Sequence, residues 1–249
     1  MALLSVNHVA KRFVEGQKMS TLFQDVFFEM KENEIICIVG PSGCGKSTLI
    51  RMIAGLEKPT EGHILFEGEE IDASNPKVAM VFQSFALLPW LNVLDNVCVG
   101  LEAIGLPEEE RKARALKFIE KVGLDGYEEA YPREISSGMK QRAGIARALA
   151  IEPELLCMDE PFSSLDPFTA ENLRDEILQL WKYNEFPTNA ILMVTHNIEE
   201  AVYLADRVIV MNGKPAKIAK IVDIDLKRPR DKKSKTFFKY TDEIYTLLT

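Results

Sequence analysis

The stretch that decides the fold of this 249-residue chain reads Gly40-Pro41-Ser42-Gly43-Cys44-Gly45-Lys46-Ser47-Thr48. It matches G-x-x-x-x-G-K-[ST], the pattern of a phosphate-binding loop. The glycines permit backbone conformations and a close approach that a Cβ would block, and the freed N–H groups form a concave nest for phosphate oxygens. Lys46 brings a point charge to the β and γ phosphates, and the Ser47 hydroxyl can bind Mg²⁺. We therefore expect a site for a nucleoside triphosphate with Mg²⁺.

Both flanks of this loop agree with that prediction. Residues 34–39 are few, apolar and β-branched, which is typical of a buried strand. Residues 48–54 have helical spacing and stop at Gly55, a residue that commonly ends helices. A strand, a glycine-rich loop and a helix in this order are the context in which the motif binds phosphate. The alternative, a glycine-rich turn that carries lysine and serine by chance, is disfavoured by this context.

Composition narrows the class of protein. With 47% hydrophobic residues, the chain can form one large domain or a domain with an inserted lobe. Its net charge of −8 argues against a stand-alone nucleic-acid binder, because neutralising phosphates needs a basic face. The four cysteines lack paired C-x-x-C spacing and are interpreted as reduced, small hydrophobic residues in a cytosolic protein. No signal peptide and no run of 18 apolar residues is found, so any membrane role is expected to come through a partner.

The rest of the chain predicts an α/β fold whose mixed sheet has an antiparallel part near the N-terminus. Strands are expected at 3–13, 22–30, 63–68, 78–82, 155–158, 190–195, 207–211 and 216–223. Helices are expected at 93–104, 107–122, 136–150, 167–184 and 198–205.

The predicted strands and helices also suggest a division into domains. No strand signal interrupts residues 85–133, which are interpreted as a helical lobe inserted into a core formed by 1–84 and 134–230. Residues 231–249 follow as a C-terminal tail. The basic run at 227–235 is expected to be mostly solvated and mobile.

Polar residues follow three of the predicted strands at their carboxyl ends, where open α/β sheets bind ligands. Gln83 follows the strand at 78–82, and its amide can reach a metal or a water. Asp159 and Glu160 end another strand, so one carboxylate suits Mg²⁺ and the other suits the deprotonation of an attacking water. His196 ends a third strand. A polar residue that merely leaves a strand is the alternative for Gln83, and a structural role is the alternative for the histidine.

Further positions each have two interpretations. Phe13 suits stacking on a base, although its position alone favours a core aromatic at a strand end. Ser136 begins a helix, where it forms an anion site or only an N-cap, and capping is favoured. Asp166 precedes the helix at 167–184 and suits a cap there. The apolar residues around Trp90 are either ordinary core or a docking surface for another protein.

Taken together, these motifs resemble the nucleotide-binding subunit of an ABC transporter over residues 3–230. The resemblance lies in their order along the chain, which runs from the phosphate-binding loop through Gln83, Ile135-Ser136-Ser137-Gly138-Met139-Lys140-Gln141-Arg142, Leu155-Leu156-Cys157-Met158-Asp159-Glu160-Pro161, Ser163-Ser164-Leu165-Asp166 and Thr195-His196. It implies a P-loop ATPase fold of the ABC type and hydrolysis of ATP, with Mg²⁺, coupled to solute transport.

The resemblance also assigns roles near the nucleotide. Adenine would stack on Phe13, and Gly40 to Thr48 would surround the phosphates. Gln83 would contact Mg²⁺ and the water and couple the site to a membrane partner. Asp159 would hold Mg²⁺ together with Ser47.

Two catalytic roles and a dimer interface complete this assignment. Glu160 would be the general base, and His196 would contact the γ-phosphate. The signature residues Ser136, Ser137, Gly138 and Met139 would close over ATP bound to a second copy of the chain. Asp166 would lie at the interface between the two copies.

The signature departs from the family's usual Leu-Ser-Gly-Gly in two places. Ile135 replaces the leucine, which is a mild change, and Ser137 replaces the first glycine. If the backbone there has φ > 0 or lies close to a phosphate, a Cβ is costly. We therefore predict that ATP binds but that closure of the dimer is weakened.

Residues 85–91 and 227–230 resemble the branch of this family that energises uptake of nitrate, taurine and aliphatic sulfonates. That resemblance implies a bacterial importer with a permease, a second ATPase subunit and an extracytoplasmic solute-binding protein, at the cytoplasmic face of the inner membrane. An ABC ATPase of DNA repair or translation is the alternative, but the single cassette, the short helical lobe and the acidic balance disfavour it. A small-molecule kinase would have no place for the signature helix or for His196.

Overall fold

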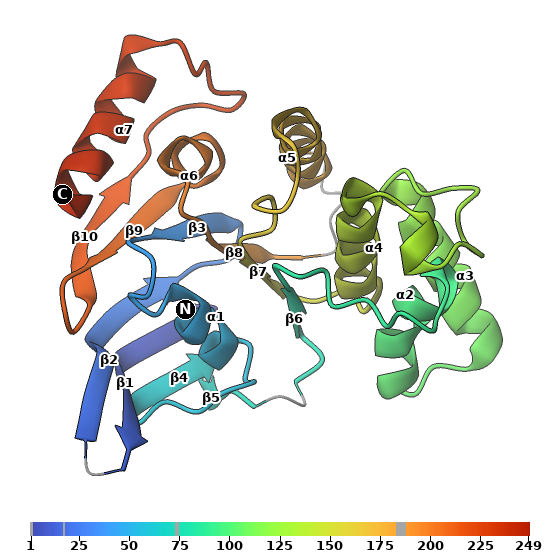
Figure 1. Ribbon diagram of the computed structural model, residues 1–249, viewed down its shortest axis with the longest axis horizontal. Helices are drawn as coiled ribbons and strands as arrows, with labels where there is room; N and C mark the ends of the chain where they lie inside the picture. Colours follow the sequence, from blue (N-terminus) through green and yellow to red (C-terminus); the bar gives the residue numbers. More distant parts are fainter. Residues whose placement is uncertain (1, 17, 73–74, 183–187) are drawn as a thin grey trace. The chain divides into compact units, whose positions relative to one another are not determined.

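The computed structural model describes residues 2–16, 18–72, 75–182 and 188–249, and the chain divides into two compact units (Figure 1). The first unit comprises Met1–Asn75 and Ala190–Thr249, and the second comprises residues 76–189. Strands dominate the first unit, whereas helices dominate the second. In the described part of the chain, no helix combines the length and the apolar character that crossing a membrane needs.

An antiparallel sheet forms the N-terminal part of the first unit, with the strand order β2-β1-β4-β5. Its strands are β1 (Leu4–Glu15), β2 (Lys18–Met30), β4 (Glu61–Phe66) and β5 (Glu69–Glu70). Irregularities in the register of β1 with β2 fall between Val6 and Arg12. The antiparallel N-terminal part that the sequence predicts is therefore confirmed.

A second sheet in this unit carries the phosphate-binding loop. Its strands there are β10 (Lys217–Asp223), β9 (Arg207–Asn212), β3 (Glu34–Val39) and β8 (Ala190–Val194), in that order. β3 runs parallel to both β8 and β9, whereas β10 pairs with β9 in the antiparallel sense, so the sheet is mixed as predicted. The loop joins β3 to α1 (Lys46–Ile53), and α1 and α6 (Ile198–Leu204) lie on opposite sides of β3 (Figure 1).

In the C-terminal arm, residues 227–249, the expectation of a solvated basic run holds for Lys227, Lys233 and Lys235, which are exposed, but not for Arg230. Arg230 is buried, with 6% of its surface exposed, and its guanidinium donates to backbone carbonyls of α6 and of the segment before the arm. Helix α7 (Lys235–Leu248) then begins at the N-cap Ser234 and packs on α6, β9 and β10. Residues 227–235, which we call the strap, are thus held against α6 because their arginines donate to backbone carbonyl oxygens.

Within residues 76–182 and 188–189, the part of the second unit that the structure describes, there are two parallel strands and four α-helices. The strands are β6 (Val78–Val81) and β7 (Leu155–Asp159), and the α-helices are α2 (Val93–Ala103), α3 (Glu108–Lys121), α4 (Ser137–Ala150) and α5 (Pro167–Lys182). A short 3₁₀ helix (Pro132–Glu134) precedes α4, and α2, α3 and α4 contact one another. The last predicted residues of α5, 183 and 184, lie outside the described residues. The boundaries predicted for the lobe at 85–133, for the core and for the tail stay a prediction.

All four cysteines have free thiols, as expected. Cys37, Cys44 and Cys157 are buried, and Cys98 is partly exposed. Burial raises the pKa of each of these thiols, and for Cys44 the ammonium of Lys46 opposes the rise. The cysteines therefore behave as small hydrophobic residues.

Candidate functional site

The phosphate-binding loop holds a buried ammonium group. Lys46 Nζ donates to the carbonyl oxygens of Gly40 (2.8 Å) and Pro41 (3.1 Å), which bend its side chain back over the loop. The N-cap residue of α1 is Gly45, which has no side chain to cap the helix, and the N-terminus of a helix is a favourable place for an anion. Lysine charge, helix N-terminus and loop amides therefore point at one small region, which suits a phosphate.

Two glycines of the loop have different structural reasons. Gly45 has φ +98°, a left-handed conformation that glycine adopts most easily, and a Cβ there would lie 2.6 Å from Phe23 Cδ1. Gly40 has no such φ, but a Cβ would lie 2.6 Å from the backbone oxygen of Met211 in β9. The loop is thus constrained by its own fold as well as by the phosphate that it is expected to bind.

His196 lies at the sheet edge to which β3 also leads. β3 and β8 are parallel, with Ile38 opposite Val194, so the residues that follow the two strands emerge side by side. The backbone N–H of Thr195 donates to Ile38 O (3.1 Å) and extends this pairing by one residue. The first unit therefore brings the loop and His196 to neighbouring strand ends, as the sequence predicts.

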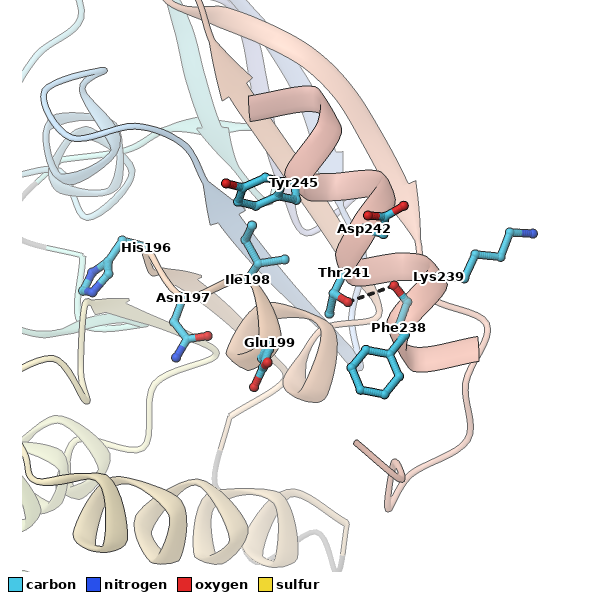
Figure 2. Close-up of a pocket in the computed structure, with 9 residues that line it drawn as sticks. All are labelled: His196, Asn197, Ile198, Glu199, Phe238, Lys239, Thr241, Asp242 and Tyr245. Atoms are coloured by element: carbon cyan, nitrogen blue, oxygen red, sulfur yellow. Dashed lines mark hydrogen bonds between the residues drawn. The ribbon is translucent and has the colours of Figure 1, made fainter. Parts of the chain in front are cut away.

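A groove of about 960 Å³ separates the beginning of α6 from α7, and His196 lies at its edge (Figure 2). Asn197, Ile198 and Glu199 form one side, and residues of α7, among them Phe238 and Tyr245, form the other. Figure 2 shows the imidazole of His196 pointing away from α7. The histidine is thus exposed and is not enclosed by α7.

Phe13 lies near the end of β1 with 42% of its surface exposed. The ammonium of Lys11 lies 5.5 Å from the centre of its ring. The core interpretation that position alone favours is therefore wrong, and the ring is accessible to a planar ligand. Stacking on adenine stays a prediction.

The second unit gathers three of the predicted residues. Gln83 follows β6 and Glu160 follows β7, and these parallel strands place them together. Gln83 Nε2 donates to Glu160 Oε2 (3.2 Å) and to Ser163 Oγ (3.3 Å), while Ser163 Oγ donates to the backbone oxygen of Glu160 (3.0 Å). Asp159 is buried at the end of β7. An amide that bonds a carboxylate, beside a second carboxylate, can orient a water and hold a hard cation.

Glu160 also has an unusual backbone. Its φ is +47°, in the left-handed region that non-glycine residues rarely adopt. Such conformations cost free energy and persist where the surrounding structure enforces them, often at functional sites. Asp159 is buried whereas Glu160 is partly exposed, so the two adjacent carboxylates have different surroundings.

The signature begins α4 as a capped helix. Ser136 Oγ accepts from the N–H of Met139 (3.3 Å), so the predicted N-cap is confirmed. Ser137 is the first residue of α4, is exposed, and is not one of the residues with positive φ. The backbone strain considered for Ser137 is therefore absent. At Gly138, in contrast, a Cβ would lie 2.7 Å from Thr169 Cγ2.

Asp166 caps the N-terminal turn of α5. Its Oδ1 accepts from the N–H groups of Phe168 (3.2 Å) and Thr169 (3.0 Å), which confirms the capping interpretation. Hydrogen bonds from Thr169, together with the N–H of Phe168, hold the pKa of Asp166 below its ordinary value. A role at an interface between two copies stays a prediction.

One arginine of α4 was missed in the sequence. Arg147 donates to the carbonyl oxygens of Ala86 (2.6 Å) and Phe85 (3.1 Å), two residues with left-handed backbones that follow Gln83. Burial lowers the pKa of Arg147. A charged residue within the small and apolar run at 143–150 was the signal that could have revealed it. Arg147 thereby joins the signature helix to the segment after Gln83.

Comparison with known proteins places these residues in a family. A family model described as "ABC transporter" matches residues 23–163. An uncharacterized ABC transporter ATP-binding protein of Methanocaldococcus jannaschii is 46% identical over 98% of this chain and 91% of its own length. An aliphatic sulfonates import ATP-binding protein of Bacillus cereus is 39% identical over 94% of this chain and 91% of its own length.

A solved structure agrees with the fold. A dimeric ATP-binding cassette, bound to ADP and phosphate in a post-hydrolysis state, superimposes with a TM-score of 0.79 at 29% identity. The match covers 90% of this chain and all of the cassette. Both fold and sequence thus agree with the resemblance drawn from the motifs.

Proposed function

This chain belongs to the ABC transporter family, and we propose that it is the ATP-hydrolysing subunit that powers an importer. The observation that carries the proposal is the phosphate-binding loop, in which the ammonium of Lys46 is held by the carbonyls of Gly40 and Pro41 beside a helix N-terminus whose N-cap is Gly45. This arrangement suits the β and γ phosphates of ATP. The homologous sulfonate import subunit supports the coupling of hydrolysis to uptake.

The metal implied by this function fits the side chains that the chain offers. Ser47, Gln83 and Asp159 supply a hydroxyl, an amide and a buried carboxylate, which are the oxygen ligands that Mg²⁺ prefers. When bound, Mg²⁺ would neutralise charge on the β and γ phosphates. Phe13, through its exposed ring, is the residue proposed to stack on the adenine.

Hydrolysis in this proposal depends mainly on positioning. Glu160 accepts the proton of the attacking water, and Gln83, which already bonds the carboxylate of Glu160, orients that water. Lys46 and His196 stabilise the charge of the γ-phosphate. Because phosphoryl transfer needs little covalent chemistry from the protein, correct placement of these groups accounts for most of the catalysis.

A second copy of the chain is proposed to complete the site. Residues 136–139 begin a 14-residue helix and would cover ATP bound to the other copy, with Asp166 at the interface. The dimeric cassette with a similar fold supports this arrangement. Closure of the dimer is a motion that can drive a membrane partner.

The membrane partner is proposed to be a permease, which would hold this chain at the cytoplasmic face of the inner membrane. Trp90 is 69% exposed in the loop before α2, and Leu87, Leu88 and Leu91 are partly exposed, which supports a docking surface here. The solute is proposed to be a small one such as a sulfonate, taurine or nitrate, delivered by an extracytoplasmic binding protein. The subunit itself would not touch the solute.

Replacement of Glu160 by glutamine tests the proposed mechanism. The variant keeps the shape of the side chain but loses the base, so it should bind ATP, hydrolyse it very slowly and accumulate as a dimer in size-exclusion chromatography. Glu154→Gln, just before β7, is the matched control and should hydrolyse ATP normally. Near-normal hydrolysis by Glu160→Gln would remove Glu160 from its role.

Copurification separates transport from the alternative. A permease that copurifies with this chain supports the importer. Copurification with ribosomes or DNA would support an ABC ATPase of translation or DNA repair instead.

A further inference from the structure

Three residues around His196 form a closed set of hydrogen bonds. Thr195 Oγ1 donates to Glu200 Oε2 (2.5 Å) and accepts from the backbone N–H of Asn197 (3.1 Å). Asn197 Oδ1 in turn accepts from the backbone N–H of Glu200 (3.1 Å). We call Thr195, Asn197 and Glu200 the Thr195 network. Both sequence neighbours of His196 are thus tied to Glu200, Thr195 through its carboxylate and Asn197 through its backbone N–H.

Two residues of the Thr195 network, Thr195 and Glu200, are buried although His196 is exposed. Thr195 retains 2% of its exposure and Glu200 retains 5%. A hydrogen bond to a carboxylate is stronger than one between neutral groups, and burial strengthens it further. Glu200 also lies in the first turn of α6, where the helix dipole favours a negative charge. The backbone at 195–197 therefore rests on a strong and rigid support.

The Thr195 network is also hydrogen-bonded to the strand that leads into the phosphate-binding loop. The N–H of Thr195 donates to Ile38 O (3.1 Å), and Gly40 follows two residues later in the sequence. A change in the Thr195 network would therefore move His196 relative to the loop that is expected to hold the γ-phosphate.

The direction of the imidazole depends on this support. Figure 2 shows His196 pointing away from α7, with Asn197 at the start of α6 beside it. The hydroxyl of threonine has a single proton, and here that proton is given to Glu200, so its oxygen faces the N–H of Asn197. The backbone on the C-terminal side of His196 thereby has one preferred orientation.

We propose that Glu200 is a positioning residue that, through Thr195 and Asn197, holds His196 in the orientation needed to contact the γ-phosphate. This inference rests on the proposed function, which assigns that contact to His196. It adds a buried acidic side chain that would touch neither ATP nor water. Without it, ATP would still bind to the loop, but its γ-phosphate would be recognised less well.

The test compares affinities for ATP and ADP, each with Mg²⁺, in purified full-length protein. Glu200→Ala should reduce the preference for ATP over ADP by about tenfold, the loss expected for one hydrogen bond to a charged group, and lower kcat. Glu199→Ala is the matched control, because Glu199 lies one residue earlier in the same turn, is exposed and is outside the Thr195 network. It should keep both quantities unchanged.

A pair of variants at Thr195 covers the case in which Glu200→Ala does not fold. Thr195→Ser retains the hydroxyl and should retain the preference for ATP. Thr195→Val has a similar shape without the hydroxyl and should lose that preference to the same extent as Glu200→Ala. Equal preference in the serine and valine variants would overturn the proposal.

A double-mutant cycle with His196→Ala separates positioning from support of the fold. If Glu200 acts through His196, adding Glu200→Ala to His196→Ala should not change the preference for ATP further, although it should lower Tm in both backgrounds. An equal further loss in both backgrounds would overturn the proposal. If His196→Ala alone leaves the preference for ATP unchanged, the role that the proposed function gives to His196 fails instead, and the present inference fails with it.

Discussion

Replacement of Arg230 by alanine should strongly destabilise the C-terminal arm and α6. The guanidinium donates to the carbonyl oxygens of Leu226 (2.9 Å), Val202 (2.7 Å) and Ala205 (2.5 Å). The last carbonyls of a helix have no partner within it, so Arg230 supplies donors that α6 lacks. Arg230 thereby fixes the strap before α7 to the end of α6.

The magnitude follows from opposing contributions. Each hydrogen bond from a charged group contributes about 1.5–3 kcal/mol, so three short ones would sum to several kcal/mol. Burial of the guanidinium opposes this, and it lowers the pKa of Arg230 to about 10. Removing one partner of such a buried set typically costs about 3–5 kcal/mol. At about 2–4 °C per kcal/mol for a chain of this size, Tm should fall by about 6–20 °C.

Thermal and urea denaturation of three variants checks this prediction. Lys233→Ala removes a nearby charge from an exposed side chain and should shift Tm little. Arg230→Lys keeps the charge but loses the planar fork of donors, so it should lie between Arg230→Ala and the unmodified chain. If Arg230→Ala costs no more than Lys233→Ala, the strap is not held by this arginine, and the reasoning fails.

Gly43→Ala should cost about 1–2 kcal/mol in urea denaturation from its φ of +78° alone, because no atom of the described residues beyond its two chain neighbours lies within 4 Å of the added Cβ; no loss of stability would contradict this. Since hydrogen bonds from Thr169 lower the pKa of Asp166, the stabilisation of α5 by the Asp166 carboxylate is present above about pH 4 and is lost as pH falls further. The Thr169 amide should therefore titrate in NMR spectra of the unmodified chain, and its titration should become flat in Asp166→Asn. A maleimide at neutral pH should label partly exposed Cys98 before buried Cys157 in mass spectrometry, and faster as pH rises.

The alternation and apolar runs of the sequence predict most strands and helices because these signals are local. The strand at 34–39 has the predicted bounds, and the helix at 107–122 differs by one residue at each end. The second strand begins earlier than predicted, at Lys18 rather than at residue 22, since its first residues pair with β1 near an exposed hairpin end. Cross-strand pairing contributes there what the sequence pattern does not show.

The C-terminal arm shows where local signals fail. Basic residues in a run usually indicate a solvated segment, and nothing near Arg230 in the sequence identifies the carbonyls of α6 as its acceptors. Helix α7 was also missed, although Phe237 and Ile244 lie seven residues apart on one face and are both buried. Burial of a charged side chain depends on tertiary contacts, which a single sequence does not reveal.

The candidate site could be predicted more fully than its support. The sequence places Gln83 and Glu160 at the carboxyl ends of strands, which is enough to expect them in a ligand site, and the parallel pairing of those strands brings them into contact. The Thr195 network depends on Glu200, a buried glutamate four residues after His196. Its role could not be predicted, because an acidic residue early in a helix is more often explained by the helix dipole. The residues expected to touch ligands thus have motifs, whereas the residues proposed to position them have none.

The signature shows how the structure changes the meaning of a departure from a family pattern. Ser137 takes the place of a glycine without backbone strain, because it begins α4 and its side chain is exposed. The steric demand lies one residue later, at Gly138, where a Cβ would meet Thr169 in the turn that Asp166 caps. Because Ser137 has no backbone strain, the predicted weakening of dimer closure would have to come from its exposed side chain at the proposed interface. The first turns of α4 and α5 are close enough that a larger residue at 138 would disturb both.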